Sequence, residues 1–340
     1  MHRRPVIALV ALLIALFAAL PVAQAENAFP CVGRDLIAEM KLKDPAAYEK
    51  LVAEAAEIPN GDSAFWRIDG PPGTKPSWLL GTIHLSDPRI VELDPKVADA
   101  LDKASVVAIE TSDSLTPEET SAVFWRTARF LVLPVGTTVF DLLSVADAQL
   151  LRQKLSAAGF DPEVSAIYQP WVVFDHIIYP ACERARSRAG FDYLDLVIAY
   201  RALANVTPVV GLEDPMAQSE LLASIPMQDQ IAYLASAIRF KYPLEDDAET
   251  AVATWRDGKI ALYYLFADGY DQLTEAEIAG AKRAETYFLD KRNLVMRDNA
   301  IPLIDKGNAF IAVGSYHLFG ENGLVELLRK AGYVVTAVEK

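Results

Sequence analysis

The sequence predicts an α/β fold with a central mixed β-sheet flanked by helices. Short apolar runs rich in β-branched residues alternate with amphipathic stretches of helical period along most of the 340 residues. Two of these runs lead into the same pattern, Gly-x-x-His-Leu, at 81–85 and 314–318. We therefore expect similar strand–loop–helix–strand units at the two ends of the chain to build the sheet, with a mostly helical middle packed beside it.

The individual elements follow from turn and capping signals. Two runs, 64–69 and 77–83, flank the turn sequence GPPGTKP and predict a β-hairpin. Asp94 followed by Pro95 predicts a short helix to about residue 104, and VVAI at 106–109 is typical of an interior strand covered on both faces. Helices are next expected at 144–158, 167–182, 193–204 and 216–240, with a strand at 208–212. A helix from Thr274 to about Asn299, a strand at 309–313, a helix at 322–331 and a strand at 333–338 complete the chain.

The first 25 residues have the pattern of a secretory signal peptide. A basic tip precedes an apolar stretch over 6–20, and a small-residue cleavage motif ends at Ala25. The alternative, a membrane anchor, needs a run of roughly 20 apolar residues, which this stretch does not reach. We expect cleavage after Ala25, which makes the mature chain, residues 26–340, periplasmic or secreted. This mature chain is expected to form one domain with a helical insertion at about 112–205. No later segment has the apolar length of a membrane span.

Charge and cysteine content narrow the class of protein further. Removing residues 1–25 changes the formal net charge from −14 to −16, and such an acidic chain without basic blocks is not expected to bind nucleic acid. In an oxidising compartment the two cysteines, Cys31 and Cys182, are expected to form a disulfide that ties the mature N-terminus to the middle of the chain. Two buried free thiols are the alternative, because sequence does not show whether they lie close together.

Four polar residues follow predicted strands and are candidates for one site. His84 and His317 end the two Gly-x-x-His patterns, while Glu110 and Glu213 directly follow the runs VVAI and VVGL. Because ligands of α/β proteins bind at the carboxyl edge of the sheet, these side chains are expected to converge there. Imidazole and carboxylate together suit a transition-metal ion. The structural alternative is that each His donates to a backbone carbonyl and each Glu caps a helix or forms an ion pair.

Three further features of the sequence bear on a possible site. Arg292 shares a helical face with apolar residues and therefore needs a partner, either a structural carboxylate or a substrate anion. His176 lies in an apolar helical segment and is expected to be a core or pocket-lining residue. The stretch GPPGTKPS at 70–77 lacks the ending and the strand-to-helix context of a phosphate-binding loop, so nucleotide binding is not expected.

Taken together, these motifs resemble the TraB/GumN family, which includes the TIKI metalloproteases. GTIH at 81–84, VVAIE ending at 110, VVGLE ending at 213, KRN at 291–293 and VGSYHLFGENGL at 313–324 stand in the family's order. CVGRDL and QPWVVF also look similar to exported bacterial members, so the resemblance runs over most of the mature chain.

This resemblance implies an exported metal-dependent hydrolase, a TIKI-like metallopeptidase that cleaves a peptide or protein with a metal-activated water. Mn²⁺ or Co²⁺ are the implied ions, with Zn²⁺ as a further candidate. Position by position, His84, Glu110 and His317 would hold the ion, and the two histidines would also take part in catalysis. Glu213 would be the general base, and Arg292 would stabilise the oxyanion or bind a substrate carboxylate. The competing class is a non-catalytic periplasmic accessory or binding protein linked to envelope polysaccharide processes.

Overall fold

A computed structural model describes residues 29–113 and 115–338. The predicted signal peptide, residues 1–25, lies outside the described residues. The described helices are α2 (Leu36–Lys43), α3 (Pro45–Ala56), α4 (Pro88–Val91), α5 (Pro95–Asp102), α6 (Pro117–Leu131), α7 (Val145–Ala157), α8 (Pro162–Ser165), α9 (Pro170–Ile177), α10 (Ala181–Arg188), α11 (Leu194–Ala204), α12 (Pro215–Ala223), α13 (Met227–Arg239), α14 (Leu244–Arg256), α15 (Ile260–Phe266), α16 (Glu275–Phe288), α17 (Asp290–Lys306) and α18 (Leu324–Lys330). Short 3₁₀ turns are η1 (Val139–Leu142), η2 (Tyr270–Gln272) and η3 (Ser315–His317).

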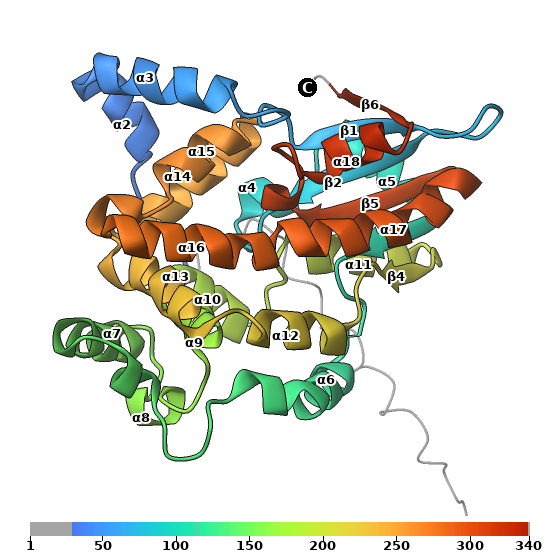
Figure 1. The fold of residues 1–340 in the computed structure, drawn as a ribbon. Helices are drawn as coiled ribbons and strands as arrows, with labels where there is room; N and C mark the ends of the chain where they lie inside the picture. The colour runs from blue at the N-terminus through green and yellow to red at the C-terminus, as the bar shows by residue number, and fades with distance from the viewer. Residues whose placement is uncertain (1–28, 114, 339–340) are drawn as a thin grey trace, which may run out of the picture.

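A six-stranded mixed sheet forms the centre of the α/β fold, as predicted. Its strands are β1 (Phe65–Asp69), β2 (Ser77–Thr82), β3 (Val106–Ile109), β4 (Val209–Gly211), β5 (Ala309–Gly314) and β6 (Val334–Ala337), in the order β4-β3-β5-β2-β1-β6. The strands β4, β3, β5 and β2 run parallel to one another, whereas β1 pairs antiparallel with both β2 and β6. The first and last strands are thus partners, and the two ends of the chain build one sheet (Figure 1).

Helices cover both faces of this sheet. On one face Leu80 and Phe310 pack in a core that includes residues of α5 and α11. On the other face the neighbouring residues Leu79 and Ile311 pack in a core with residues of α17 and α18. Successive side chains of a strand point to opposite faces, so apolar residues at consecutive positions require cover on both sides. The predicted interior strand β3 fits this arrangement, because its last three residues are buried.

A helical lobe lies beside the sheet and supplies the rest of the core. The helices α9 and α16 both pack on α13, with α7 outside them and α12 and α6 below (Figure 1). The range predicted as a helical insertion, about 112–205, contains α6 through α11. Of these, α11 packs on the sheet, while α7 and α9 pack on α13.

Three predicted helices are each divided in two. The helix expected at 167–182 is divided into α9 and α10 by Pro180, and that expected at 216–240 into α12 and α13 by Pro226, because proline cannot continue a helix. The capping box at Thr274 is confirmed, but the long helix bends at Leu289, where φ is −116° and ψ is −72°. The bend lets α16 pack on α13 while α17 packs on β5 and α18.

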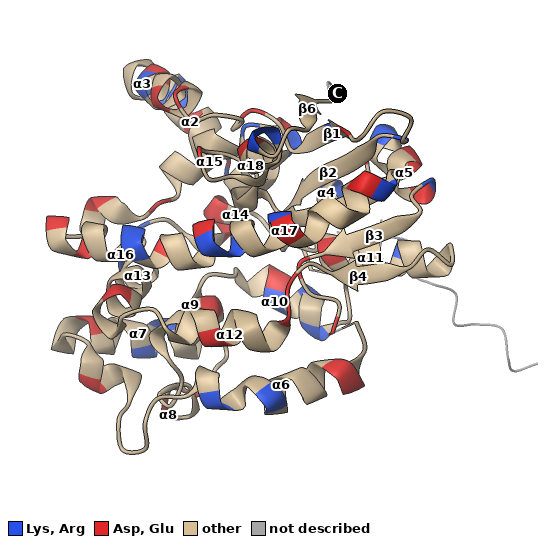
Figure 2. Ribbon diagram, turned by 45° about the vertical axis from the view of Figure 1, so that its right-hand side comes forward, with Lys and Arg blue, Asp and Glu red and all other residues tan. Residues whose placement is uncertain are grey.

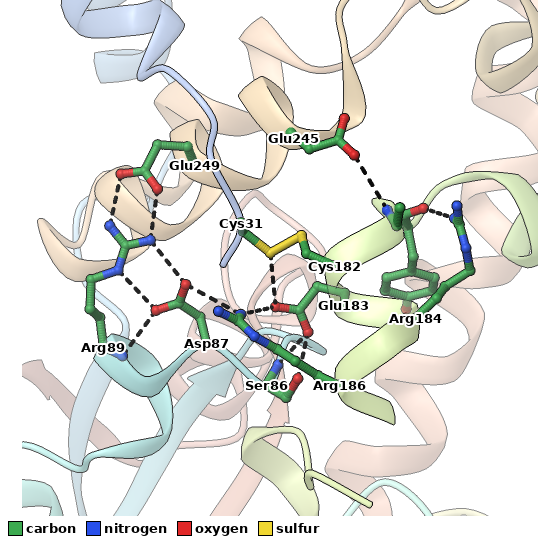
Figure 3. The surroundings of a disulfide bond; sticks show 12 residues. Cys31, Ser86, Asp87, Arg89, Cys182, Glu183, Arg184, Arg186, Glu245 and Glu249 are labelled. Carbon is green, nitrogen blue, oxygen red and sulfur yellow. Dashed lines mark hydrogen bonds and ion pairs between the residues drawn. A yellow bond between two sulfur atoms is a disulfide. The ribbon is translucent and has the colours of Figure 1, made fainter. Parts of the chain in front are cut away.

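The predicted disulfide between Cys31 and Cys182 is present, with a Cα–Cα distance of 5.3 Å. It fixes the segment before α2 to the start of α10 (Figure 3). Beside it, Glu183 accepts hydrogen bonds from the backbone and hydroxyl of Ser86 and pairs with Arg186 at 2.7 Å. This N-terminal attachment therefore also braces the loop that follows the first Gly-x-x-His pattern.

Charged residues of both signs are spread over the helices of both the lobe and the sheet layers (Figure 2). Within residues 29–113 and 115–338, no helix combines the length and apolarity that crossing a membrane requires.

Candidate functional site

The parallel strands deliver the predicted site residues to one edge of the sheet. His84 follows β2, Glu110 follows β3, Glu213 follows β4 and His317 lies at the end of η3, just after β5. Thr82 of β2 lies opposite Gly314 of β5 in the register of these two strands. Because all four strands point the same way, their carboxyl ends meet at this edge.

The first glycine of the repeated pattern allows the two loops to touch. A Cβ atom on Gly81 would lie 2.8 Å from Leu318 Cδ2 and 3.0 Å from Ser315 Cα, so a side chain has no room there. The Ser315 hydroxyl donates to the carbonyl of Thr82 at 2.6 Å. The repeat is therefore two loops that pack against each other.

The second glycine lies where the three predicted metal ligands approach one another. A Cβ atom on Gly314 would lie 3.2 Å from Glu110 Oε1, 3.6 Å from His317 Cδ2 and 3.8 Å from His84 Nε2. The Gly314 N–H donates to Glu110 Oε1 at 2.7 Å, and His317 Nε2 lies 3.8 Å from the same oxygen. The structure thus brings His84, Glu110 and His317 around one point.

Each histidine is held through its Nδ1 atom. His84 Nδ1 lies 3.0 Å from Asp195 Oδ2, whose other oxygen accepts the Thr82 hydroxyl at 2.7 Å. His317 Nδ1 lies 2.7 Å from Asn293 Oδ1, so this nitrogen carries the proton because the amide oxygen can only accept. In both rings the Nε2 atom is left for the shared point.

Sequence reasoning assigned no role to these two orienting residues. Asn293 was visible as the last residue of the KRN motif, which is a usable signal. Asp195 has no comparable signal, because it comes from the first turn of α11 and reaches the site only through tertiary packing.

Arg292 is buried between two carboxylates. Its Nη2 atom donates to Glu110 Oε2 at 2.6 Å and to Glu213 Oε2 at 2.7 Å, and its Nε atom donates to both Glu213 oxygens. In this structure the partners of the arginine are therefore Glu110 and Glu213.

Burial and these charges shift the pKa values in opposite directions. Burial would raise the pKa of Glu110, but Arg292 and the two imidazoles hold it well below its usual range. Burial lowers the pKa of His317 to about 3, so this ring is neutral at pH 7. Desolvation also favours neutral His84, although its side chain is 45% exposed, and the carboxylates of Asp195 and Glu110 outweigh it and raise its pKa to about 9.

The residues around Gly314 suit a divalent transition ion in their chemistry. Metal-binding histidines typically donate their other ring N–H to a carboxylate or another oxygen acceptor, as His84 and His317 are placed to do with Asp195 and Asn293. Within the described residues, however, no group of three or more His, Cys, Asp or Glu side chains is arranged to hold an ion. Both Glu110 oxygens are engaged by Gly314 and Arg292, although each carboxylate oxygen retains a second lone pair.

A cavity of about 440 Å³ opens beside the shared point. Its walls include His84, Glu110, Arg292 and His317, but Glu213 is not among its lining residues. Asp175 of α9, which sequence reasoning did not single out, also lines it with a side chain that is exposed to the cavity; desolvation by the surrounding protein raises the pKa of this carboxyl to about 6, although His84 opposes the shift.

Two other sequence features lie elsewhere. His176 stacks on Phe160 with ring centroids 4.3 Å apart and does not line the cavity, and its buried Nδ1 has no partner in the described part of the chain. The stretch 70–76 forms the turn between β1 and β2, as predicted.

Comparison with known proteins gives relatives that align with most of this chain. The chain is 23% identical over 266 residues to the uncharacterized protein YbaP of Shigella flexneri and 22% identical to YbaP of Escherichia coli K12. Each alignment covers 76% of this chain and 89% of the relative. No solved structure matches it significantly. The model of the TraB/PrgY/gumN family matches residues 64–337, which include every residue of the site, and the protein therefore belongs to this family.

Proposed function

We propose that this protein is an exported metal-dependent hydrolase that cleaves peptide bonds. The observation that carries the proposal is the approach of His84, Glu110 and His317 to one point at Gly314, with both rings held through Nδ1. The disulfide supports export, since such bonds are typical of oxidising compartments.

In this proposal His84, Glu110 and His317 hold the ion, with Mn²⁺ or Co²⁺ favoured and Zn²⁺ a further candidate. A bound divalent ion supplies Lewis-acid polarisation of a carbonyl and lowers the pKa of a water molecule. Asp195 and Asn293 keep the two rings in position, which is the usual role of such outer partners.

We assign the proton transfer to a carboxylate that faces the cavity. The family resemblance pointed to Glu213, but this side chain is buried against Arg292 and does not line the cavity. Asp175 does line it with an accessible side chain, and desolvation by the surrounding protein raises its pKa to about 6. A group with a pKa near the working pH is suited to take a proton from water and return it to the leaving nitrogen. In that step the water oxygen bonds to the carbonyl carbon and the C–N bond breaks.

Arg292 then acts from a fixed position. Glu213 and Glu110 hold its guanidinium at the cavity wall, where it lies ready to stabilise negative charge on the carbonyl oxygen. The bonds to Glu110, Glu213 and the Phe288 carbonyl leave one N–H of Nη1, which can donate to an oxyanion but cannot hold a substrate carboxylate through two parallel bonds.

The test is the metal content of the chain from Glu26 onward, measured by elemental analysis after incubation with Mn²⁺, Co²⁺ or Zn²⁺. We expect His84→Ala and His317→Ala to lose the ion, while His176→Asn, the matched control at the third histidine of that chain, keeps it. Peptide-library cleavage should require the same ion and stop with a chelator.

Retention of the ion by both alanine variants would overturn the metal site. Metal binding without cleavage of any peptide would instead favour the binding-protein alternative.

A further inference from the structure

We propose that the cavity beside the site binds a cationic group on an apolar stem, such as the side chain of Lys or Arg in a peptide. This names a substrate class and, for turnover, rests on the proposed hydrolase function; binding itself does not depend on it.

Two carboxylates in the cavity wall carry the proposal. Asp247 of α14 accepts a hydrogen bond from the Tyr263 hydroxyl at 3.0 Å, and Glu285 of α16 accepts one from the Tyr264 hydroxyl at 2.9 Å. Neither forms an ion pair within 4.0 Å with a basic side chain among residues 29–113 and 115–338. Tyrosine hydroxyls satisfy part of their hydrogen bonding but leave their charge uncompensated.

Elsewhere among the described residues, most buried carboxylates have arginine partners, and Asp195 is held by His84 and the Thr82 hydroxyl. Such pairs are Asp147–Arg239, Asp229–Arg283, Asp246–Arg34, Glu183–Arg186 and Asp87–Arg89. A carboxylate removed from water without a cationic partner is costly, which explains this pairing. Among the described residues that line the cavity, Arg292 is the one Lys or Arg, and Glu110 and Glu213 already occupy it.

Aromatic rings form the walls between the site and these acids. Tyr316, next to His317, contacts the ring of Tyr264 at a centroid distance of 5.3 Å, and Tyr264 in turn bonds Glu285. Tyr233 stacks on Phe288 at 4.7 Å on the same cavity. Aromatic faces attract ammonium and guanidinium groups, and they also accommodate the apolar stem that carries such a group.

The electrostatics agree with this geometry. Burial raises the pKa of Asp247 to about 6, and it raises the pKa of Glu285 although Lys282, which forms no ion pair with this carboxylate, opposes the shift. The cavity volume of about 440 Å³ lies within the range of small-ligand sites.

The experiment uses the chain from Glu26 onward, as purified, with labelled pentapeptides that differ at one central position. Lys and Arg are compared with norleucine, which keeps the stem without the charge, and with Glu. We expect the Lys or Arg peptide to bind at least about tenfold more tightly than the norleucine peptide by fluorescence anisotropy. Mass spectrometry confirms that each peptide stays intact during the titration.

Two variants with matched controls locate the effect. Glu285→Gln and Asp247→Asn should each reduce the Lys preference severalfold. Glu275→Gln on the exposed start of α16 and Asp257→Asn at the exposed end of α14 should keep it, which separates the cavity from the general acidity of the protein.

Equal binding of the Lys and norleucine peptides to the wild type would overturn the proposal, whether or not a variant folds. So would a preference that survives in both folded cavity variants. Cleavage is measured in a separate assay. Tighter binding of the Lys or Arg peptide without hydrolysis would refute only the hydrolase function. Hydrolysis without tighter binding of these peptides would refute only the cationic pocket.

Discussion

The absence of one Cβ atom at Gly314 keeps open the point where the three proposed ligands approach. The backbone there has φ −51° and ψ 137°, which any L-residue adopts, so the glycine is not explained by backbone strain. Its role is spatial, because a methyl group would lie 3.2 Å from Glu110 Oε1.

Gly314→Ala should therefore affect the site far more than the fold. We expect the variant to bind the metal ion at least about tenfold more weakly, since a shift of one ligand is worth a kcal/mol or more. Its free energy of unfolding should change by about 1 kcal/mol or less. Metal titration and urea unfolding of the same preparation measure both quantities. Unchanged metal affinity would contradict the assigned role of Gly314.

The two candidate carboxylates differ in what their removal should do to the pH profile. If Asp175 is the base, it must be ionised, so kcat/KM should fall as pH drops below about 6. Asp175→Asn should remove most activity, roughly 10²–10⁴-fold, together with this acidic limb. Glu213→Gln should lower kcat while the limb stays, because Glu213 acts by holding Arg292.

The reverse result, with the acidic limb lost in Glu213→Gln and kept in Asp175→Asn, would restore the general-base role that the family resemblance implied for Glu213.

Much of the site was predictable because its residues directly follow strands. His84, Glu110, Glu213 and His317 stand at strand ends, and parallel strands bring such positions together regardless of what lies between them. Asp175 was not predictable as a site residue, because it lies on a helix of the lobe whose placement against the sheet depends on tertiary packing.

At the scale of elements, local signals predicted where helices begin better than where they end. Caps at Thr274 and Asp94 are confirmed, because a side-chain cap depends on residues within one turn. The bend at Leu289 has no local signal, since neither proline nor glycine marks it. The bend follows from the different elements that α16 and α17 pack against, and these contacts exist only in the folded molecule.

The attachment of the N-terminal helices to the rest of the molecule gives a prediction at this scale. Cys31 and Cys182 are 151 positions apart, and closing so long a loop in the unfolded chain is worth about 4–5 kcal/mol in the entropic description. We expect the Cys31→Ser, Cys182→Ser double variant to lose a few kcal/mol of unfolding free energy in urea.

The matched control is Lys50→Ala, which removes an exposed pair with Glu54 at 3.7 Å and should change stability by less than about 0.5 kcal/mol. A double serine variant as stable as the wild type would show that the N-terminal segment is held by its other contacts, such as Arg34 with Asp246.

For the whole molecule, the sequence predicted the sheet but not the cavity. The repeated pattern and the apolar strands indicate one sheet built from both ends, which β1 and β6 confirm by pairing. The cavity lies where helices α9, α13, α14, α15 and α16 meet the sheet edge. Its acids come from helices far apart in the chain, so no motif marks them.

The same acids should cost the folded protein stability, and Asp247 allows this to be measured. Its pKa is raised from 3.8 to about 6 on folding, so the folded state binds more protons than the unfolded state between these values. The contribution of Asp247 to the free energy of unfolding should therefore fall by about 1–3 kcal/mol as pH rises from about 4 to about 6. Asp247→Asn lacks this titration, and its amide oxygen still accepts the Tyr263 hydroxyl.

We expect the stability advantage of Asp247→Asn over the wild type in urea unfolding to be greater at pH 8 than at pH 4 by about 1–3 kcal/mol. The control variant Asp257→Asn should show no such difference. A residue that destabilises the fold at neutral pH fits a binding role, because functional sites commonly trade stability for activity. An Asp247→Asn stability difference that is the same at both pH values would show that the charge of Asp247 is already compensated, and the cavity would then have no need of a cation.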